Sequence, residues 1–145
     1  MIARTIIVLS FFAAMYGIAA GAGNTRNETA RTLCNPDKIG QTNAWVACLQ
    51  SEAKRSEEVL SKLIVKIEST MSAADMLEKP VRLKNVAVFK SAQTNWFKLR
   101  DEDCKAYAAH AAGLGFGAAQ VRLECVVDDT LSRIRFLSSR YEVSQ

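Results

Sequence analysis

The chain has 145 residues, with 19 lysine and arginine residues against 15 aspartate and glutamate residues, and a net charge of +4 at pH 7. Charges of both signs are interspersed, which argues against nucleic-acid binding, because that function needs basic residues clustered on one face. A chain of this length makes one domain and buries about two thirds of the surface that its unfolded form exposes. We therefore expect one small domain without a nucleic-acid partner.

An apolar stretch at the N-terminus is typical of a secretory signal peptide. Arg4 supplies a positive start, and residues 6–18 contain one clearly polar residue. Ala20-Gly21-Ala22 then has the A-x-A form that signal peptidase reads. We predict a signal peptide over residues 1–22 with cleavage after Ala22, and Ala20 is the alternative cleavage point.

A retained membrane anchor is the alternative to cleavage. A spanning helix needs roughly 20 apolar residues, whereas this run is shorter and ends in small residues and glycine. A lipid anchor would need a cysteine at the cleavage point, and the first cysteine is Cys34. We expect a mature protein without a membrane segment, with residues 23–33 as a flexible leader. Cleavage leaves 18 basic and 15 acidic residues, a net charge of +3.

Three long segments have apolar residues at every third or fourth position, which predicts helices. The first runs over residues 42–71, with Thr42 as its N-cap. The second covers residues 79–112, starts at Pro80 and ends at a cluster of three glycines. The third covers residues 118–141. Short connections favour antiparallel neighbours, so the predicted fold is an all-α, antiparallel bundle of three long helices.

Four cysteines, Cys34, Cys48, Cys104 and Cys125, follow the export signal and predict two disulfides. In an up-down-up bundle all four lie at one end, so each of the three pairings is geometrically open. We favour Cys34–Cys48 and Cys104–Cys125, because each pair closes a short loop across a helix terminus, and alternating connectivity is the alternative. On the chain-entropy estimate, each disulfide contributes about 3 kcal/mol. The bundle then begins with a disulfide-tied loop.

The second helix contains the motif Q-x-x-W-x-x-x-R-D-x-x-C, which runs from Gln93 to Cys104. The third helix contains C-x4-T-x2-R-x3-L, which runs from Cys125 to Leu137. With the first two cysteines and Glu57, these motifs resemble the N-terminal domain family of LprI-like lysozyme inhibitors. We assign residues 34–141 to such a domain.

The resemblance implies a non-catalytic binding protein of the bacterial envelope, periplasmic or secreted. Its implied partner is a protein, most concretely a lysozyme-type muramidase whose glycan cleft is occluded by loops at one end of the bundle. The alternative is an envelope interaction or immunity-like module with a different protein partner. The family's usual Leu-Asn, Tyr and Asp in the first helix are here Leu60-Ser61, Ile64 and Glu57. A partner site that used those groups is altered in this chain.

Several motif residues are expected to meet at one height. Counted from the cysteine of its own helix, each of Glu57, Trp96 and Arg133 lies eight or nine residues into the bundle. We predict that the Arg133 guanidinium lies against Trp96 and pairs with Glu57, and that Gln93 or Arg100 completes the hydrogen bonds. This structural cluster would fix the register of the helices. The alternative is that its exposed part binds a partner.

Catalytic chemistry lacks its usual residues. His110 is the single histidine, and its place near the end of the second helix is typical of a helix C-terminal cation. The cysteines lack the close C-x2-C spacing of zinc sites. We therefore expect no enzyme, no bound metal and no cofactor.

Two groups of residues remain as candidates for binding a protein partner. Adjacent acids on a helix point in different directions, so the acidic clusters are expected to form solvated faces that offer complementary charges. The glycine-rich loop after the second helix carries apolar side chains that either cap the core or anchor a partner. The candidates are Asp101, Asp103, Leu114, Phe116, Asp128 and Asp129.

Overall fold

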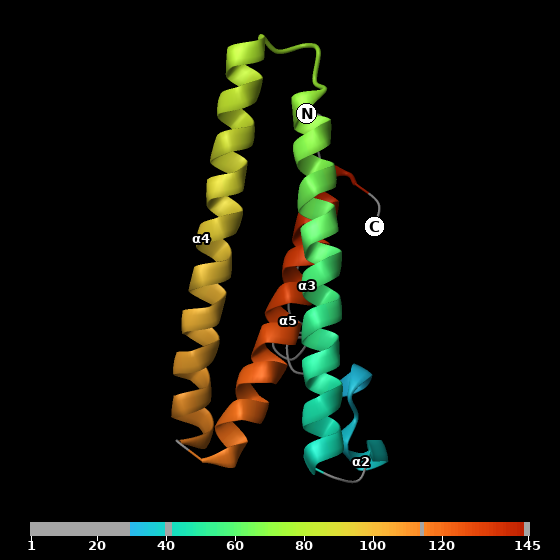
Figure 1. Ribbon diagram of the computed structural model, residues 1–145, viewed down its shortest axis with the longest axis vertical. Helices are drawn as coiled ribbons and strands as arrows, with labels where there is room; N and C mark the ends of the chain where they lie inside the picture. The colour runs from blue at the N-terminus through green and yellow to red at the C-terminus, as the bar shows by residue number, and fades with distance from the viewer. Residues whose placement is uncertain (1–29, 40–41, 114, 144–145) are drawn as a thin grey trace, which may run out of the picture.

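The computed structural model describes residues 30–39, 42–113 and 115–143 (Figure 1). Three long helices form the domain, and they are α3 (Thr42–Ser72), α4 (Lys79–Ala112) and α5 (Phe116–Tyr141). The described residues contain no strand. The predicted all-α fold is therefore confirmed, and the third helix begins two residues earlier than predicted. A short helix that the sequence did not predict, α2 (Pro36–Ile39), precedes the bundle.

Local backbone chemistry sets the boundaries of α4. Pro80 stands in the first turn, where a missing backbone N–H costs no helical hydrogen bond. Gly113 ends the helix with φ +65°, a conformation that residues with side chains rarely adopt. Its backbone N–H donates to the carbonyl of Ala109. Both predicted signals, the proline start and the glycine stop, are confirmed.

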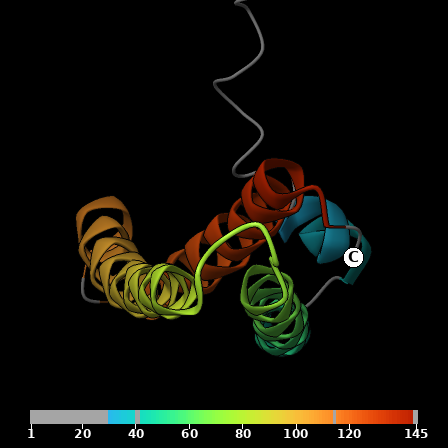
Figure 2. The same ribbon diagram turned by 90° about the horizontal axis from the view of Figure 1, so that it is seen from above.

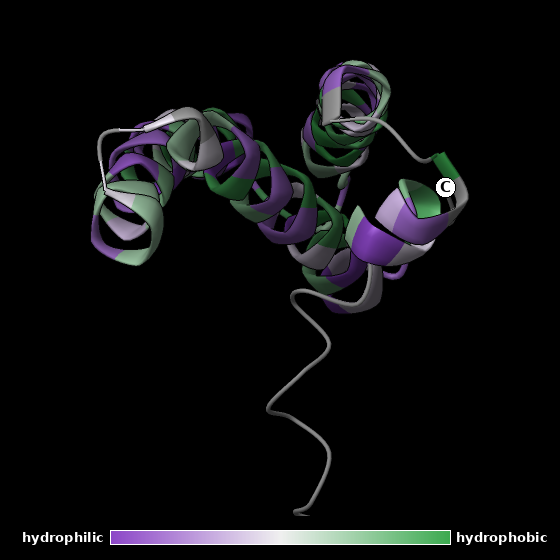
Figure 3. Cartoon of the chain, turned by 90° about the horizontal axis from the view of Figure 1, so that it is seen from below, coloured by the Kyte–Doolittle hydropathy of each residue, from purple (hydrophilic) through white to green (hydrophobic). Residues whose placement is uncertain are grey.

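The central helix of the domain is α5. It packs against both α3 and α4, which contact each other less. In Figure 1, α3 and α4 run antiparallel and α5 crosses behind them. Seen from above, α4 lies at the left, and α5 runs diagonally from beside α4 past α3 to the upper right (Figure 2). Because the described helices pack against α4 on one side only, much of its surface is exposed in this part of the chain. Figure 3 shows hydrophobic residues interspersed with hydrophilic ones around the helices.

The core has two apolar clusters along the length of the bundle. The cluster at the disulfide end contains Leu49, Ala53, Cys104, Val126 and Val127, among other buried residues. The second cluster contains Leu60, Leu63, Ile67, Phe89, Ile134 and Leu137. Between them lie buried polar side chains of all three helices, which are Ser56, Gln93, Arg100 and Thr130. We call these four residues the polar layer.

The segment before Cys34 is more ordered than the sequence indicated. Residues 30–33 are helical, and Ala30 is completely buried. The backbone N–H of Ala30 donates to Asp128 Oδ1 over 2.8 Å, and Arg31 Nε lies 3.3 Å from Glu124 Oε1. The last four residues of the predicted leader are therefore helical, and acidic side chains of α5 contact Ala30 and Arg31, whereas the flexibility of the leader stays a prediction.

The predicted signal peptide and its cleavage site lie outside the described residues. Within the ranges that the structure describes, no helix is long and apolar enough to cross a membrane.

Candidate functional site

Two disulfides clamp one end of the bundle, and both favoured pairings are confirmed. Cys34–Cys48 joins the segment before α2 to α3, with a Cα–Cα distance of 5.7 Å. Cys104–Cys125 joins the end of α4 to the start of α5, with a Cα–Cα distance of 5.5 Å. The side chains that surround this clamped end are therefore held by covalent bonds as well as by packing.

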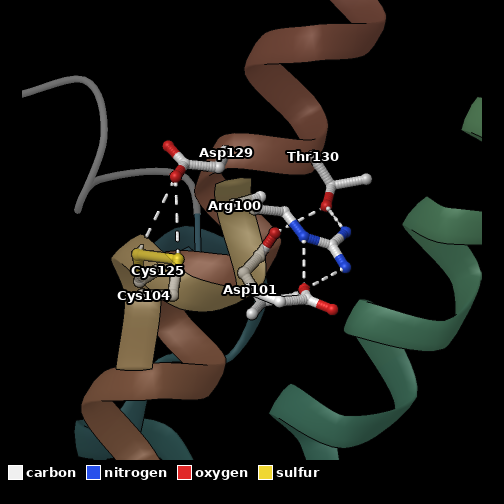
Figure 4. Close-up of a disulfide and its surroundings, with 7 residues drawn as sticks. Arg100, Asp101, Cys104, Cys125, Asp129 and Thr130 are labelled. Atoms are coloured by element: carbon white, nitrogen blue, oxygen red, sulfur yellow. Dashed lines mark hydrogen bonds and ion pairs between the residues drawn. A yellow bond between two sulfur atoms is a disulfide. The ribbon is translucent and has the colours of Figure 1, made fainter. Parts of the chain in front are cut away.

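Arg100 is the centre of the polar layer, and its side chain is 4% exposed. Its Nη2 donates to Glu57 Oε1 and to Asp101 Oδ1, each at 2.7 Å. Its Nη1 donates to the Thr130 hydroxyl at 2.8 Å, and that hydroxyl donates to the carbonyl of Val126. Figure 4 shows the guanidinium between Asp101 and Thr130. One buried cation thus links α3, α4 and α5.

Trp96 lies between two guanidinium groups. The Cζ atom of Arg100 is 5.5 Å from the indole centroid, and that of Arg133 is 5.3 Å from it. Gln93 Oε1 accepts hydrogen bonds from Arg133 Nε and Nη2 at 3.2 and 2.8 Å, and Gln93 Nε2 donates to the Phe89 carbonyl. Desolvation by burial lowers the pKa of Arg133 from its ordinary value.

The structure brings the five predicted cluster residues together, but Arg100 takes the place that was predicted for Arg133 at Glu57. Arg133 stacks on Trp96, as the sequence predicted. The predicted pair between Arg133 and Glu57 is wrong, because Arg100 takes that carboxylate and Arg133 bonds to the neutral amide of Gln93. Spacing from the cysteines predicted the common height of these residues, whereas the direction of each side chain around its helix decides which partner it contacts.

Asp101 and Asp103 lie on different sides of α4. Asp101 lines a hollow of about 460 Å³ with Ala53, Glu57, Arg122 and other residues of the three helices. We call this hollow the α3–α4 groove. Its two carboxylates are accessible, with side-chain exposures of 43% for Glu57 and 50% for Asp101. Asp103 instead lines a hollow between α4 and α5.

Asp128 and Asp129 contradict the expectation of a solvated acidic face. Asp128 is 1% exposed and Asp129 is 8% exposed, because both point from α5 into the clamped end of the bundle. The pKa of Asp128 is raised to about 6, chiefly by burial. The hydrogen bond from the Ala30 N–H opposes this rise, and the nearby carboxylates of Glu124 and Asp129 add to it. Asp128 Oδ2 has no hydrogen-bond partner among the residues that the structure describes. Asp128 is thus a candidate for a structural role and not for surface contact.

The Asp129 carboxylate lies beside the Cys104–Cys125 disulfide, with Oδ2 at 3.6 and 3.8 Å from the two sulfurs (Figure 4). A disulfide sulfur carries no hydrogen, so these are contacts and not hydrogen bonds. The three residues are close enough together to resemble a metal-ligand set. However, both sulfurs are consumed by the disulfide, and metals bind the thiolate form of cysteine.

The glycine-rich loop is only partly described. Leu114 and the side chain of Phe116 lie outside the described residues, so their predicted role as an anchor stays a prediction. His110 is exposed in the last turn of α4, at the place that the sequence indicated.

Sequence reasoning missed two functional neighbours of Arg100. Thr130, the threonine of the C-x4-T-x2-R-x3-L motif, is completely buried and binds the guanidinium. A hydroxyl among the apolar residues on one side of the third helix was the signal that could have indicated this contact. Phe97, whose ring centroid lies 5.1 Å from Arg100 Cζ, gave no signal of its own.

Comparisons with known proteins bear on the same residues. The family model described as "Lysozyme inhibitor LprI" matches residues 34–137, which run from the first cysteine to the last turns of α5. A search of the curated proteins and a search of the solved structures each found no match to this chain.

Proposed function

The chain belongs to the LprI family of lysozyme inhibitors, and on that premise we propose that its exported form binds a lysozyme-type muramidase and blocks the glycan cleft without catalysis. The observation that carries the proposal is the family match over nearly the whole described bundle. Two disulfides support a location outside the cytoplasm, in the periplasm or beyond the cell, because disulfides persist in oxidising compartments.

The α3–α4 groove is the surface that we assign to the muramidase. Glu57 and Asp101 share one guanidinium, that of Arg100, so the group of three keeps a net negative charge. Their partly exposed carboxylates are held by ion pairs to a buried arginine beside a disulfide. Binding of a partner to these carboxylates therefore loses little side-chain conformational entropy.

Charge supports this choice of surface. Lysozymes are usually basic, and a chain with a net charge of +3 after signal cleavage gains no long-range attraction to them. Local carboxylates at the contact must then supply the complementarity. Arg122 also lines this groove, and its positive charge reduces the attraction to a basic partner.

The test is a cell-wall lysis assay in which the mature protein is titrated into lysozyme. We expect slower lysis, about tenfold weaker inhibition for the variant Glu57→Gln/Asp101→Asn, and stronger inhibition for Arg122→Glu. Glu58→Gln is the matched control, because Glu58 is an exposed acid beside Glu57 that does not line the groove. Phe116→Ala tests whether the glycine-rich loop also contacts the enzyme. Circular dichroism spectra and melting temperatures verify that each variant folds.

Absence of any slowing at a large molar excess would remove the inhibitor function. The envelope interaction or immunity-like module with another protein partner would then be the better description. If all the variants slow lysis equally, the inhibitor function stands but the contact site lies outside the α3–α4 groove.

A further inference from the structure

A second surface, between α4 and α5, exposes large apolar side chains. Two adjoining hollows of about 260 and 370 Å³ share Arg133 and Phe136. On α4 they extend from Lys84 to Asp103, and a helix segment of that length spans about 28 Å. We call this surface the α4–α5 groove.

The middle of the α4–α5 groove exposes large apolar side chains around Arg133, and further charged residues lie at its ends. Val88 is 61% exposed, Leu99 is 64% exposed and Phe136 of α5 is 51% exposed. Lys84 lies at one end of the groove and Asp103 lies at the other. An exposed apolar strip with charged ends is typical of a protein contact surface.

The order of these residues along α4 is symmetric about the midpoint between Gln93 and Thr94. Lys84 precedes Val88 by four residues, and Asp103 follows Leu99 by four residues. Residues at such spacings lie on one face of a helix. When a second α4 is laid antiparallel across the first, Val88 of each chain comes level with the partner's Leu99, and Lys84 comes level with the partner's Asp103.

We propose that the α4–α5 groove is the contact surface of a two-fold symmetric homodimer in which the α4 helices of two copies pack antiparallel. A two-fold interface must be complementary to itself, and this surface meets that condition in charge as well as in apolar contact. At each of the two ends of the interface, Lys84 of one copy lies level with Asp103 of the other. The α3–α4 groove, on the other side of α4, stays open in each copy.

Sedimentation equilibrium of the mature protein from about 1 to 200 μM tests the dimer. We expect a monomer–dimer equilibrium within this range, and a loss of dimer affinity of at least about 100-fold for Val88→Glu, since two charges enter the apolar strip. Val65→Glu is the matched control, because Val65 is 65% exposed on α3 and lies outside the groove. It should leave the dimer unchanged.

Charge exchange tests the antiparallel register. Lys84→Asp or Asp103→Lys alone should weaken the dimer about tenfold, and the variant with both changes should restore it. A monomer at 200 μM, or a dimer that Val88→Glu does not weaken, overturns the proposal. Failure of the double variant to restore affinity overturns the antiparallel pairing of α4. Melting temperatures near that of the parent verify that loss of the dimer is not loss of the fold.

Discussion

Replacement of Asp128 by asparagine should stabilise the protein at neutral pH, although it removes a hydrogen-bonded carboxylate. The side chain is 1% exposed, and burial raises its pKa from 3.8 to about 6. The folded state therefore holds the proton more tightly than the unfolded state does. Ionisation of Asp128 in the folded state lowers the free energy of unfolding. This loss is complete above about pH 6 and absent below about pH 4.

The expected gain follows from the size of the shift. A difference of about two pH units, at about 1.36 kcal/mol for each unit, corresponds to about 3 kcal/mol at pH 7. Asparagine keeps an oxygen that can accept the hydrogen bond from the Ala30 N–H. Its amide N–H₂ takes the place of Oδ2, an oxygen that has no partner in the described part of the chain, and this burial of an unpaired donor costs about 1 kcal/mol. A net gain of about 2 kcal/mol at pH 7 is expected. It should be lost as the pH falls toward 4, where the cost of the amide remains and the variant should be slightly less stable than the parent.

Urea unfolding of the oxidised protein at pH 4, 5, 6, 7 and 8, followed by circular dichroism, measures this gain. Asp75→Asn is the matched control, because Asp75 is an exposed aspartate in the α3–α4 connection, and its effect should stay within about 0.5 kcal/mol. If Asp128→Asn proves less stable than the parent at pH 7, or if its effect does not change with pH, the account of a costly buried carboxylate is refuted.

The remaining predictions concern the polar layer and the disulfide. Arg100→Met should lower the free energy of unfolding by about 3 kcal/mol in urea titrations. Arg100→Lys should recover only part of this loss, since an ammonium group cannot reach all three oxygen partners together. Equal stability of the parent and Arg100→Met would contradict the role of Arg100 in linking the helices. Thr130→Val keeps the shape but removes the hydroxyl, and calorimetric melting should show a loss of about 1–2 kcal/mol. Asp129→Asn should speed the reduction of Cys104–Cys125 by glutathione about fivefold, because the carboxylate repels the attacking thiolate. That ratio should fall in high salt, and a ratio of one in low salt would exclude the electrostatic effect.

The helices and disulfides could be predicted because their signals are local. Apolar spacing, Pro80 and the glycines after residue 112 place the ends of α4, and short loops favour the observed cysteine pairs. The height of Glu57, Trp96 and Arg133 in the bundle could also be predicted, since each is a fixed number of residues from a cysteine in its own helix.

Contacts that depend on the direction of a side chain around its helix could not be predicted in the same way. The partner of Glu57 is one case: Arg100 pairs with it and Arg133 does not, although both arginines lie near the height of the carboxylate. The burial of Asp128 is another, since it depends on Ala30, which is 98 residues away in the chain. Neither relation leaves a periodic pattern in the sequence.

Calorimetric titration of the mature protein into lysozyme, with and without a chitooligosaccharide that fills the glycan cleft, tests the central claim most directly. Occlusion of the cleft predicts a binding heat in the absence of the sugar and a large loss of apparent affinity in its presence. Binding that the sugar does not affect, or no binding heat in either experiment, would contradict it.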